Sequence, residues 1–393
     1  MSYELLTVGG LFGLWVLLPL IPSILIFLIF PMTTIMTRGP LALLTLRAGA
    51  AFVAYLIVFA AGYPIVQTMI GKVLYFDPLN RNIDRKADQN GHPYDDAIAV
   101  YDDAIRLNPR SIDAWTGRAE AYSRLGDYDR AIEDYNNAIN IESNNPVLFN
   151  DRGAIYEKAG NYSLAAKDYD QAIRLNPHYA LAFGNRCSVH YRKKEYEEAI
   201  KDCDRAIQLD PTRINSYIQR GDALRRLKRF TDAINDYDKA LALGPDSQPA
   251  LFGRARAHEG AQMRSEAIED YSRIIQLDPK SADAWNNRCW ARAATDELRL
   301  ALSDCNESLR LNPDSPWALD SRGFVHLRMG SLDESITDYN SALERRPDSP
   351  SSLYGRGIAR LKKGDESNGR EDLMNAERID NGIAQEFASY GVR

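Results

Sequence analysis

The chain has 393 residues, enough for more than one domain, with 48 basic and 54 acidic side chains and a net charge of −6. Nucleic-acid-binding proteins normally carry a basic excess, so this balance argues against that class. Hydrophobic residues make up 45% of the chain and charged residues 26%, which excludes a chain that is disordered throughout. The apolar residues are concentrated near the N-terminus, so an apolar segment precedes an acidic one.

Two uncharged stretches, 5–37 and 48–71, are each longer than the roughly 20 apolar residues that cross a bilayer as a helix. We expect a transmembrane hairpin over residues 1–71, with helices at about 8–30 and 48–70. No basic residue precedes the first stretch, unlike in a secretory signal peptide, so we expect the mature protein to retain the hairpin. The alternative is one spanning helix beside a cleaved or re-entrant piece.

The charges around these stretches predict their orientation. Arg38 and Arg47 lie between the stretches, whereas the N-terminal tail has no Lys or Arg. Because positively charged loops stay in the cytoplasm, the residues after 71 are expected outside, in the periplasm if the membrane is a bacterial inner membrane. Lys72, close to the second stretch, favours the cytoplasmic side, which remains the alternative.

The rest of the chain repeats with a period of 34 residues. Arginine recurs at this interval from Arg118 to Arg356, and aspartate recurs from Asp134 to Asp372. Such a period is typical of repeat arrays, in which one unit is too small to bury its apolar residues alone. We therefore expect an all-α solenoid whose units are pairs of helices.

Ile112 is counted as position 1 of the first unit. A large apolar residue stands at position 4, a small residue at position 8 and an aromatic residue or cysteine at position 24, as in Trp115, Ala119 and Tyr135. In these features the units resemble the tetratricopeptide repeat family. The resemblance implies a right-handed superhelical solenoid of helix-turn-helix repeats. It divides the chain into a linker with a degenerate first repeat at 72–111, eight repeats at 112–383 and a C-terminal cap at 384–393.

Local signals mark the ends of the expected helices. A Ser or Asn that can accept a backbone N–H precedes position 1 at Ser111, Asn145, Ser247, Ser281, Ser315 and Ser349. Proline occupies the first helical turn at Pro146, Pro316 and Pro350, where its missing N–H costs nothing. A turn near position 15 brings the recurring arginine at position 7 close to the aspartate at position 23, and we interpret these as structural ion pairs.

The four cysteines occupy positions 8 and 24 of two units, as Cys187 with Cys203 and Cys289 with Cys305. These positions face each other across a helical hairpin, and no unit has one cysteine alone. We predict two disulfides within the hairpins, which require an oxidising compartment, whereas buried free thiols are the alternative. A zinc site is not expected, because each pair offers only two ligands.

The sequence carries no recognisable catalytic chemistry. It has neither a Gly-rich phosphate loop after a strand nor a His-Glu-x-x-His motif. His190, His258 and His326 all stand at position 11, two repeats apart, and we interpret them as replacing a core tyrosine. We therefore expect no enzyme, no cofactor and no metal.

The family binds partners mainly through positions 2, 5, 9, 12 and 13, which line a concave groove. Carried over to this sequence, the resemblance implies a basic groove centre followed by an aromatic half. The residues are Tyr191, Arg192, Arg225, Arg226, Phe252, Arg256, Trp290, Trp317, Phe324 and Tyr354. Two alternatives are open: the arginines at position 13 offset the dipole at a helix end, and the C-terminal cap covers the aromatics.

These features together favour a membrane-anchored scaffold that binds a partner protein or peptide in the groove. The alternative is an accessory or assembly subunit of a larger membrane protein complex, docked through its transmembrane hairpin. The layout is similar to that of membrane factors that assemble c-type cytochromes, which is an analogy of layout only. In both cases the partners are a protein and the lipid bilayer, with no nucleic acid.

Overall fold

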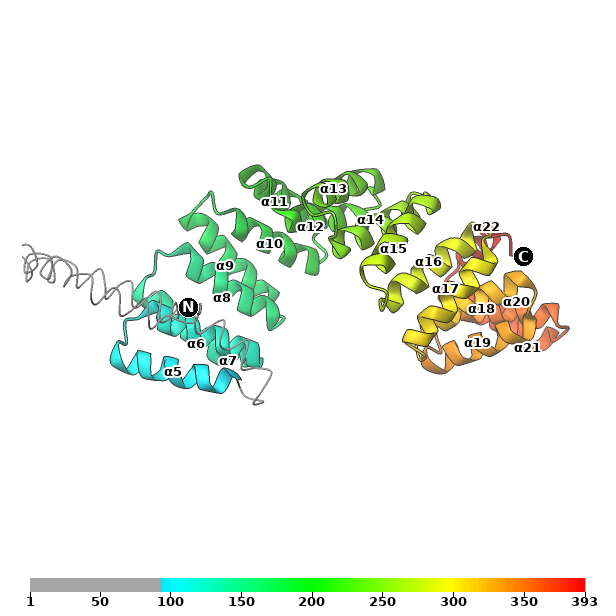
Figure 1. Ribbon diagram of the computed structural model, residues 1–393, viewed down its shortest axis with the longest axis horizontal. Helices are drawn as coiled ribbons and strands as arrows, with labels where there is room; N and C mark the ends of the chain where they lie inside the picture. The colour runs from blue at the N-terminus through cyan, green and yellow to red at the C-terminus, as the bar shows by residue number, and fades with distance from the viewer. Residues whose placement is uncertain (1–92, 393) are drawn as a thin grey trace, which may run out of the picture. The chain divides into compact units, whose positions relative to one another are not determined.

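The computed structural model describes residues 93–392, and its helices are labelled as in Figure 1. The expected transmembrane hairpin, with helices at about 8–30 and 48–70, lies outside the described residues. Within 93–392, none of the helices combines the length and apolar character that crossing a membrane requires. The chain divides into two units between Arg130 and Ala131, and each is described by itself.

The first unit contains α5 (Pro93–Leu107), α6 (Ile112–Leu125) and the first turn of α7 (Tyr128–Ile141). Gly117 on α6 lies against the ring of Tyr101 on α5, so closely that a Cβ at Gly117 would be 2.4 Å from Cζ of the tyrosine. Arg118 forms an ion pair with Asp102 on α5. The helix α5 therefore packs on α6 as the second helix of the degenerate repeat.

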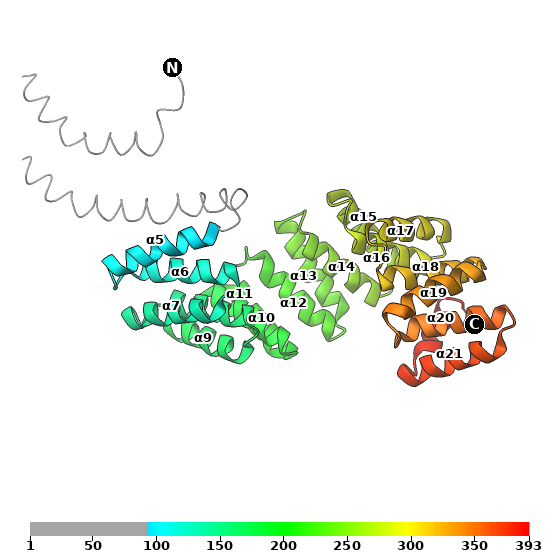
Figure 2. The same ribbon diagram turned by 90° about the horizontal axis from the view of Figure 1, so that it is seen from below.

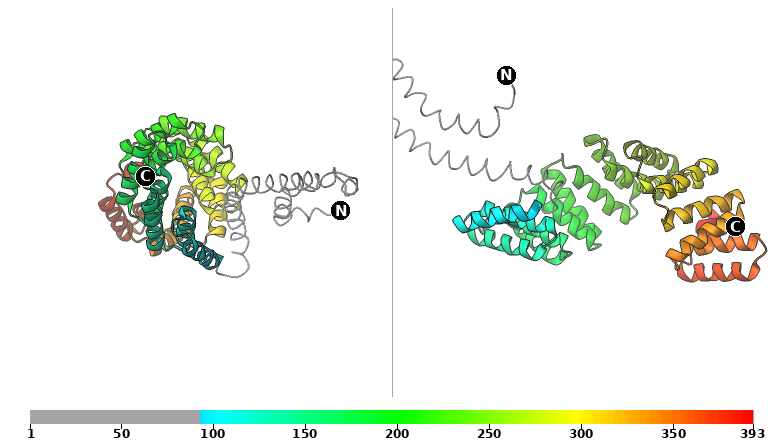
Figure 3. Two further views of the ribbon diagram at one scale, coloured as in Figure 1. Left: turned by 90° about the vertical axis from the view of Figure 1, so that its left-hand side faces the viewer. Right: turned by 60° about the horizontal axis from the view of Figure 1, so that its bottom comes forward.

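The second unit holds the rest of α7 and fifteen further described helices, of which α8 to α21 form successive antiparallel pairs and α22 follows the last pair (Figures 1 and 2). They are α8 (Pro146–Lys158), α9 (Tyr162–Leu175), α10 (Ala180–Arg192), α11 (Tyr196–Leu209), α12 (Ile214–Arg226), α13 (Phe230–Leu243), α14 (Gln248–Gly260), α15 (Arg264–Leu277), α16 (Ala282–Ala294), α17 (Leu298–Leu311), α18 (Pro316–Met329), α19 (Leu332–Arg345), α20 (Pro350–Lys362), α21 (Glu366–Ile379) and α22 (Ile383–Ser389). Within this unit, each pair is rotated relative to the one before it (Figure 3). The predicted all-α solenoid is confirmed for the described residues.

The predicted helix caps are confirmed at four of six places. The side chains of Ser111, Asn145, Ser315 and Ser349 accept backbone N–H groups of the following helix. The prediction is wrong for Ser247 and Ser281, whose side chains make no capping hydrogen bond. At Ser281 the N–H of Ala284 donates to the backbone carbonyl instead, at 3.1 Å.

A left-handed residue stands at position 15, in the turn between the two helices of every repeat from 112 onward. Glycine fills this place at Gly126, Gly160, Gly330 and Gly364, with φ between 77° and 89°. Four other repeats use Lys194, Lys228, Gln262 and Asp296, with φ between 60° and 69°. Residues with a Cβ adopt this conformation at a cost of about 1 kcal/mol, so the turn geometry is imposed by the packed helices.

Two fully buried tyrosines in the core of the second unit are wedged between glycines. Tyr339 at position 24 is fully buried, and Cβ atoms added at Gly323 and Gly355 would lie only 3.1 and 2.2 Å from it. Gly323 belongs to the same repeat as Tyr339, whereas Gly355 belongs to the next. Tyr237 lies in the same way between Gly221 and Gly253. The tyrosine therefore packs both within a repeat and between neighbouring repeats.

Candidate partner-binding surface

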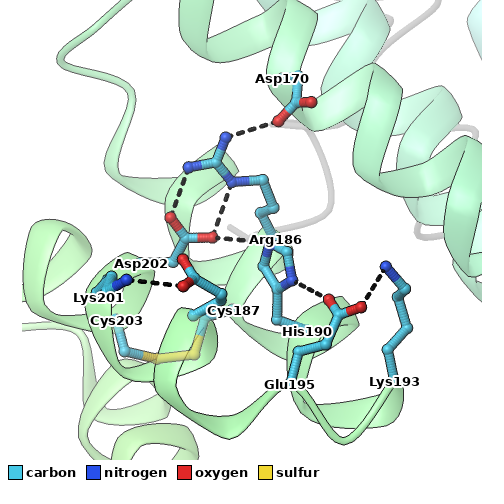
Figure 4. Close-up of polar contacts among 10 residues, drawn as sticks. Asp170, Arg186, Cys187, His190, Lys193, Glu195, Lys201, Asp202 and Cys203 are labelled. Atoms are coloured by element: carbon cyan, nitrogen blue, oxygen red, sulfur yellow. Dashed lines mark hydrogen bonds and ion pairs between the residues drawn. A yellow bond between two sulfur atoms is a disulfide. The ribbon is translucent and has the colours of Figure 1, made fainter.

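The arginine at position 7 joins neighbouring repeats (Figure 4). Arg186 on α10 donates from Nε and Nη2 to Asp202 on α11, at 2.8 and 2.5 Å. Its Nη1 donates to Asp170 of the preceding repeat at 2.6 Å. The same double linkage recurs at Arg152, Arg220, Arg254, Arg288, Arg322 and Arg356, with an Asp, Asn or Ser as the partner in the preceding repeat. The predicted structural ion pairs are confirmed, and these arginines are occupied by the scaffold.

Position 11 adds a second basic group to several of these ion pairs. Arg292 lies 2.7 Å from Asp304, and Arg360 lies 2.7 Å from Asp372. The histidine Nδ1 of His258 lies 3.2 Å from Asp270. The three position-11 histidines each lie beside an aspartate at position 23 of their own repeat, at distances of 3.2 to 3.9 Å. Within the described residues, no group of three or more His, Cys, Asp or Glu side chains could hold a metal ion.

The cysteines occupy the place that a glycine and a tyrosine fill in other repeats. Cys187 and Cys203 form a disulfide between α10 and α11, with Cα atoms 5.5 Å apart (Figure 4). Cys289 and Cys305 form the second disulfide, between α16 and α17, with Cα atoms 5.4 Å apart. All four side chains are fully buried. Each disulfide thus replaces the ring that packs against position 8 elsewhere.

We call the side chains at positions 2, 5, 9, 12 and 13 of the first helices the first-helix face. In its middle part, Arg192, Arg226 and Arg256 are exposed. Arg226 Nε donates to the Tyr191 hydroxyl at 3.2 Å, which connects α12 to α10. None of the three arginines is paired with a carboxylate among residues 93–392, so their charges are available to a partner.

Arg225 differs from its neighbour Arg226, and its predicted role as a partner-binding residue needs correction. Its side chain is only 16% exposed and lies 3.4 Å from the carboxylate of Asp222. That carboxylate also accepts a hydrogen bond of 2.8 Å from the buried Tyr237 hydroxyl. Position 12 therefore points into the packed helices whereas position 13 points to solvent, so Arg225 serves the scaffold.

Glu259 is a residue of this face that the sequence analysis missed. It accepts a hydrogen bond of 3.2 Å from the Tyr271 hydroxyl. Burial raises the pKa of Glu259 to about 7, although the Tyr271 hydrogen bond and nearby arginines, first among them Arg256, act in the opposite direction. Glu259 stands at position 12, which the family resemblance assigns to the groove. The residue could therefore have been found from its repeat position.

The predicted open aromatic part of the face is corrected by the structure. Phe324 is 1% exposed and Tyr354 is 8% exposed, because the C-terminal helix α22 and the residues after it cover them. Trp290 is half-buried in the same cluster. The cap expected at the end of the array thus lies on the side chains that were predicted to meet a partner.

The two remaining predicted residues have different surroundings. Trp317 is 58% exposed, with the Arg346 guanidinium 3.6 Å from its ring centroid. Phe252 is half-buried, and its ring lies edge-on to Tyr271 with centroids 6.1 Å apart. In the middle part of the face, Arg226 contacts Tyr191, and Glu259 contacts Tyr271. At the end of the array, Trp290, Phe324 and Tyr354 lie together under the C-terminal residues.

A stack of paired helices with position-specific packing defines an α-solenoid, and sequence comparison gives its family. Tetratricopeptide repeat models match residues 85–146, 150–214 and 214–247, and a further TPR repeat model matches 327–364. The chain belongs to the tetratricopeptide repeat family. A model of the protein prenyltransferase alpha subunit repeat matches residues 264–294. No curated protein matches the sequence.

Solved structures share the fold. The Cut9–Hcn1 hetero-tetramer of the APC/C is 16% identical, with a TM-score of 0.50, over 76% of this chain and 59% of that chain. A tetratricopeptide repeat protein from Parabacteroides merdae is 18% identical, with a TM-score of 0.49, over 67% of this chain and 98% of that one. YrrB, described as having an unusual peptide-binding site, is 21% identical, with a TM-score of 0.43, over 49% and 98%. At this identity the first similarity supports the helical repeat fold alone.

Proposed function

We propose that this protein is a non-enzymatic, membrane-anchored scaffold that binds an acidic segment of a partner protein on the middle part of its first-helix face. Proteins of this family act through protein–protein contacts, which the solenoid fold supports. The proposal adds the location of the contact and the chemistry of the partner.

The observation that carries the proposal is the free charge of three arginines. From Arg152 onward, the arginines at position 7 are each held by polar side chains of two repeats, but Arg192, Arg226 and Arg256 are exposed and make no ion pair within the described residues. They stand on three successive first helices, α10, α12 and α14. Because opposite charges attract, this positive surface favours a partner segment that carries carboxylates.

The membrane part of the proposal rests on the sequence. The uncharged stretches 5–37 and 48–71 are long enough for two spanning helices, and Arg38 and Arg47 between them favour a cytoplasmic loop. The array would then lie outside, in a compartment where disulfides persist. A scaffold held at a membrane surface captures partners that lie in, or pass along, the same membrane.

The test is capture of partners by the full-length chain in its native membrane. After cross-linking and mass spectrometry, we expect the chain with Arg192→Glu, Arg226→Glu and Arg256→Glu to lose the proteins that the unmodified chain retains. Association should also become less sensitive to salt, because charge on such a face mainly governs the encounter rate.

Lys239→Glu is the matched control, because Lys239 is exposed on the second helix α13 and has no ion-pair partner in the described range. The control should retain every partner. If the triple variant also retains them all, the arginines are not the site. The transmembrane hairpin, through which an accessory subunit would dock onto a larger complex, would then be the better candidate.

A further inference from the structure

The C-terminal segment, residues 383–392, is seated on the first-helix face instead of continuing the stack. It comprises α22 and the three residues after it. Ile383 and Phe387 are 2% exposed and Val392 is 7% exposed. The Phe387 ring lies 4.9 Å from the ring centroid of Tyr354 on α20 and 5.6 Å from that of Phe324 on α18. One apolar side of this short helix therefore meets the first helices of two different repeats.

Tyr390 extends the contact towards the N-terminal side of the array. Its ring centroid lies 5.5 Å from that of Trp290 on α16 and 5.6 Å from that of Phe324, both edge-on. The guanidinium of Arg264, at the start of α15, lies 5.7 Å from the same ring. A segment of ten residues thus touches α15, α16, α18 and α20, so these helices converge on one site.

The way in which the segment is held resembles a docked ligand. No ion pair among the described residues ties 383–392 to the array, and the Ser389 hydroxyl donates only within its own helix, to the Glu386 carbonyl. The turn before α22 is held locally, where the Gly382 N–H donates to Asp380 at 2.8 Å. The anchors are Ile383, Phe387 and Tyr390, which follow the i, i+4, i+7 spacing of one helix side.

We propose that Trp290, Phe324, Tyr354 and Arg264 form a docking site for a short partner helix with an aliphatic residue followed by two aromatic residues at this spacing. The segment 383–392 is the resident occupant of the site, and the partner helix displaces it. The inference rests on the proposed scaffold function for its purpose, but it concerns a different part of the face.

The tether explains why the site is closed in the free protein. A short linker gives the segment an effective local concentration on the order of millimolar, so a partner must bind more tightly than the segment does or be tethered itself. Aromatic anchors in a desolvated site are the side chains that carry most binding free energy. The site therefore selects partners by their aromatic residues, whereas the middle part of the face selects by charge.

The test uses a fluorescein-labelled synthetic peptide with the sequence of residues 380–392 and the full-length chain. Phe387→Asp in the chain should release the tethered segment and open the site. We expect this variant to bind the peptide, by fluorescence anisotropy, at least about tenfold more tightly than the unmodified chain does. Gln385→Ala is the control, because Gln385 is exposed on the other side of α22, and it should behave as the unmodified chain.

Two further variants distinguish opening of the site from loss of folding. Tyr390→Ala, at a half-buried position, should also admit the peptide and carries the test if Phe387→Asp lowers the helix content seen by circular dichroism. Trp290→Ala combined with Tyr390→Ala should abolish peptide binding. The charge reversals at Arg192, Arg226 and Arg256 should leave it unchanged within about twofold, so failure of the charge-based site and failure of this one are distinguishable.

The proposal would be overturned if the opened variants keep their helix content and bind no peptide, because the segment is then a permanent cap. Hydrogen exchange on the unmodified chain gives a test without substitutions. Amides of 383–392 should exchange at least about tenfold faster than those in the middle of α20. Equal protection, or a dimer that the peptide dissociates, would contradict a displaceable segment bound within its own chain.

Discussion

The middle of the second unit, α10 to α15, and its end, α16 to α22, are built on the same repeat but present different chemistry. At position 9, the middle has Ser188, Asp222 and Arg256, whereas the end has Trp290, Phe324 and Ile358. The position-7 arginines and their aspartates are the same in both regions. The comparison teaches that the scaffold positions fix the stack, whereas the face positions are free to become a charged surface or an apolar one.

The largest expected difference between the regions is the decrease in the free energy of unfolding when one phenylalanine is replaced by alanine. Phe324 is buried among Trp290, Phe387 and Tyr390, whereas Phe252 is half-buried at the edge of a core cluster that includes Tyr271. Phe324→Ala should cost about 3–5 kcal/mol, the range for fully buried aromatics, and Phe252→Ala roughly half as much. Urea unfolding followed by circular dichroism measures both, and equal costs would show that the end is no better packed than the middle.

The disulfides place one covalent link in each region. Each closes a loop of 16 residues, so reduction should lower the free energy of unfolding by about 3 kcal/mol per pair. Non-reducing peptide mapping should recover Cys187 with Cys203 and Cys289 with Cys305.

A double substitution provides the control for the link in the middle. Cys187→Gly with Cys203→Tyr installs the glycine and tyrosine that neighbouring repeats use at these positions. This variant should unfold at the same denaturant concentration with and without reductant, except for the effect of the second pair. Alkylation of all four cysteines in denatured protein without reductant would contradict the disulfides and weaken the assignment to an oxidising compartment.

Two carboxyl groups should make stability depend on pH in both regions. Burial raises the pKa of Asp320 to about 6, although Ser352 and Ser351 donate hydrogen bonds to it. Burial likewise raises the pKa of Glu259 to about 7. A raised carboxyl pKa means that the folded state holds the proton more tightly. The stability that these two groups contribute is therefore greatest below the unfolded pKa of about 4 and is lost as the pH rises through 6 to 7.

Neutral replacements at these two positions should remove this decrease in stability with rising pH. Asp320→Asn and Glu259→Gln should each raise the free energy of unfolding by about 1–3 kcal/mol at pH 8 and change it little at pH 4. Thermal unfolding across this range gives the measurement. A variant that is destabilised equally at both pH values would show that the carboxyl is needed for its hydrogen bonds in either protonation state.

The smallest expected effect concerns the turns. In the middle region, Lys228 adopts φ of 60° at the turn position where Gly330, in the end region, adopts 81°. Lys228→Gly should raise the free energy of unfolding by about 0.5–1 kcal/mol, and Gly330→Ala should lower it by a similar amount. Opposite shifts of the unfolding midpoint are the expected result, and shifts of the same sign would show that the lysine side chain contributes a contact of its own.

Much of the stack could be predicted from sequence, because its determinants recur every 34 residues. The recurring arginine at position 7 and aspartate at position 23 predicted the ion pairs, and proline and serine predicted most helix starts. The failure at Ser281 came from local competition, because the backbone carbonyl of Ser281 takes the N–H of Ala284 that its side chain would cap. Such competition depends on local backbone geometry, which a repeat pattern does not encode.

The candidate surface was less predictable, because it depends on residues that occur once. Arg225 and Arg226 are adjacent and chemically identical, yet one is held by Asp222 and the other reaches Tyr191. The repeat pattern around Phe324 and Tyr354 is the same whether or not another segment covers them, so it does not predict their burial. Their burial is decided by Phe387 and Tyr390, which lie after the last repeat and outside its period.

The double linkage of the position-7 arginine has a mechanical consequence. Because Arg186 bonds at once to Asp170 in one repeat and Asp202 in the next, no boundary between these repeats can open without breaking ionic hydrogen bonds. Stacked repeats behave as a one-dimensional chain whose cooperativity is set by nearest-neighbour coupling. Because a hydrogen-bonded link recurs at these boundaries, ionic at Arg186, Arg220 and Arg254, we expect a pull applied at one end of the array to bend many repeats slightly before any single repeat unfolds.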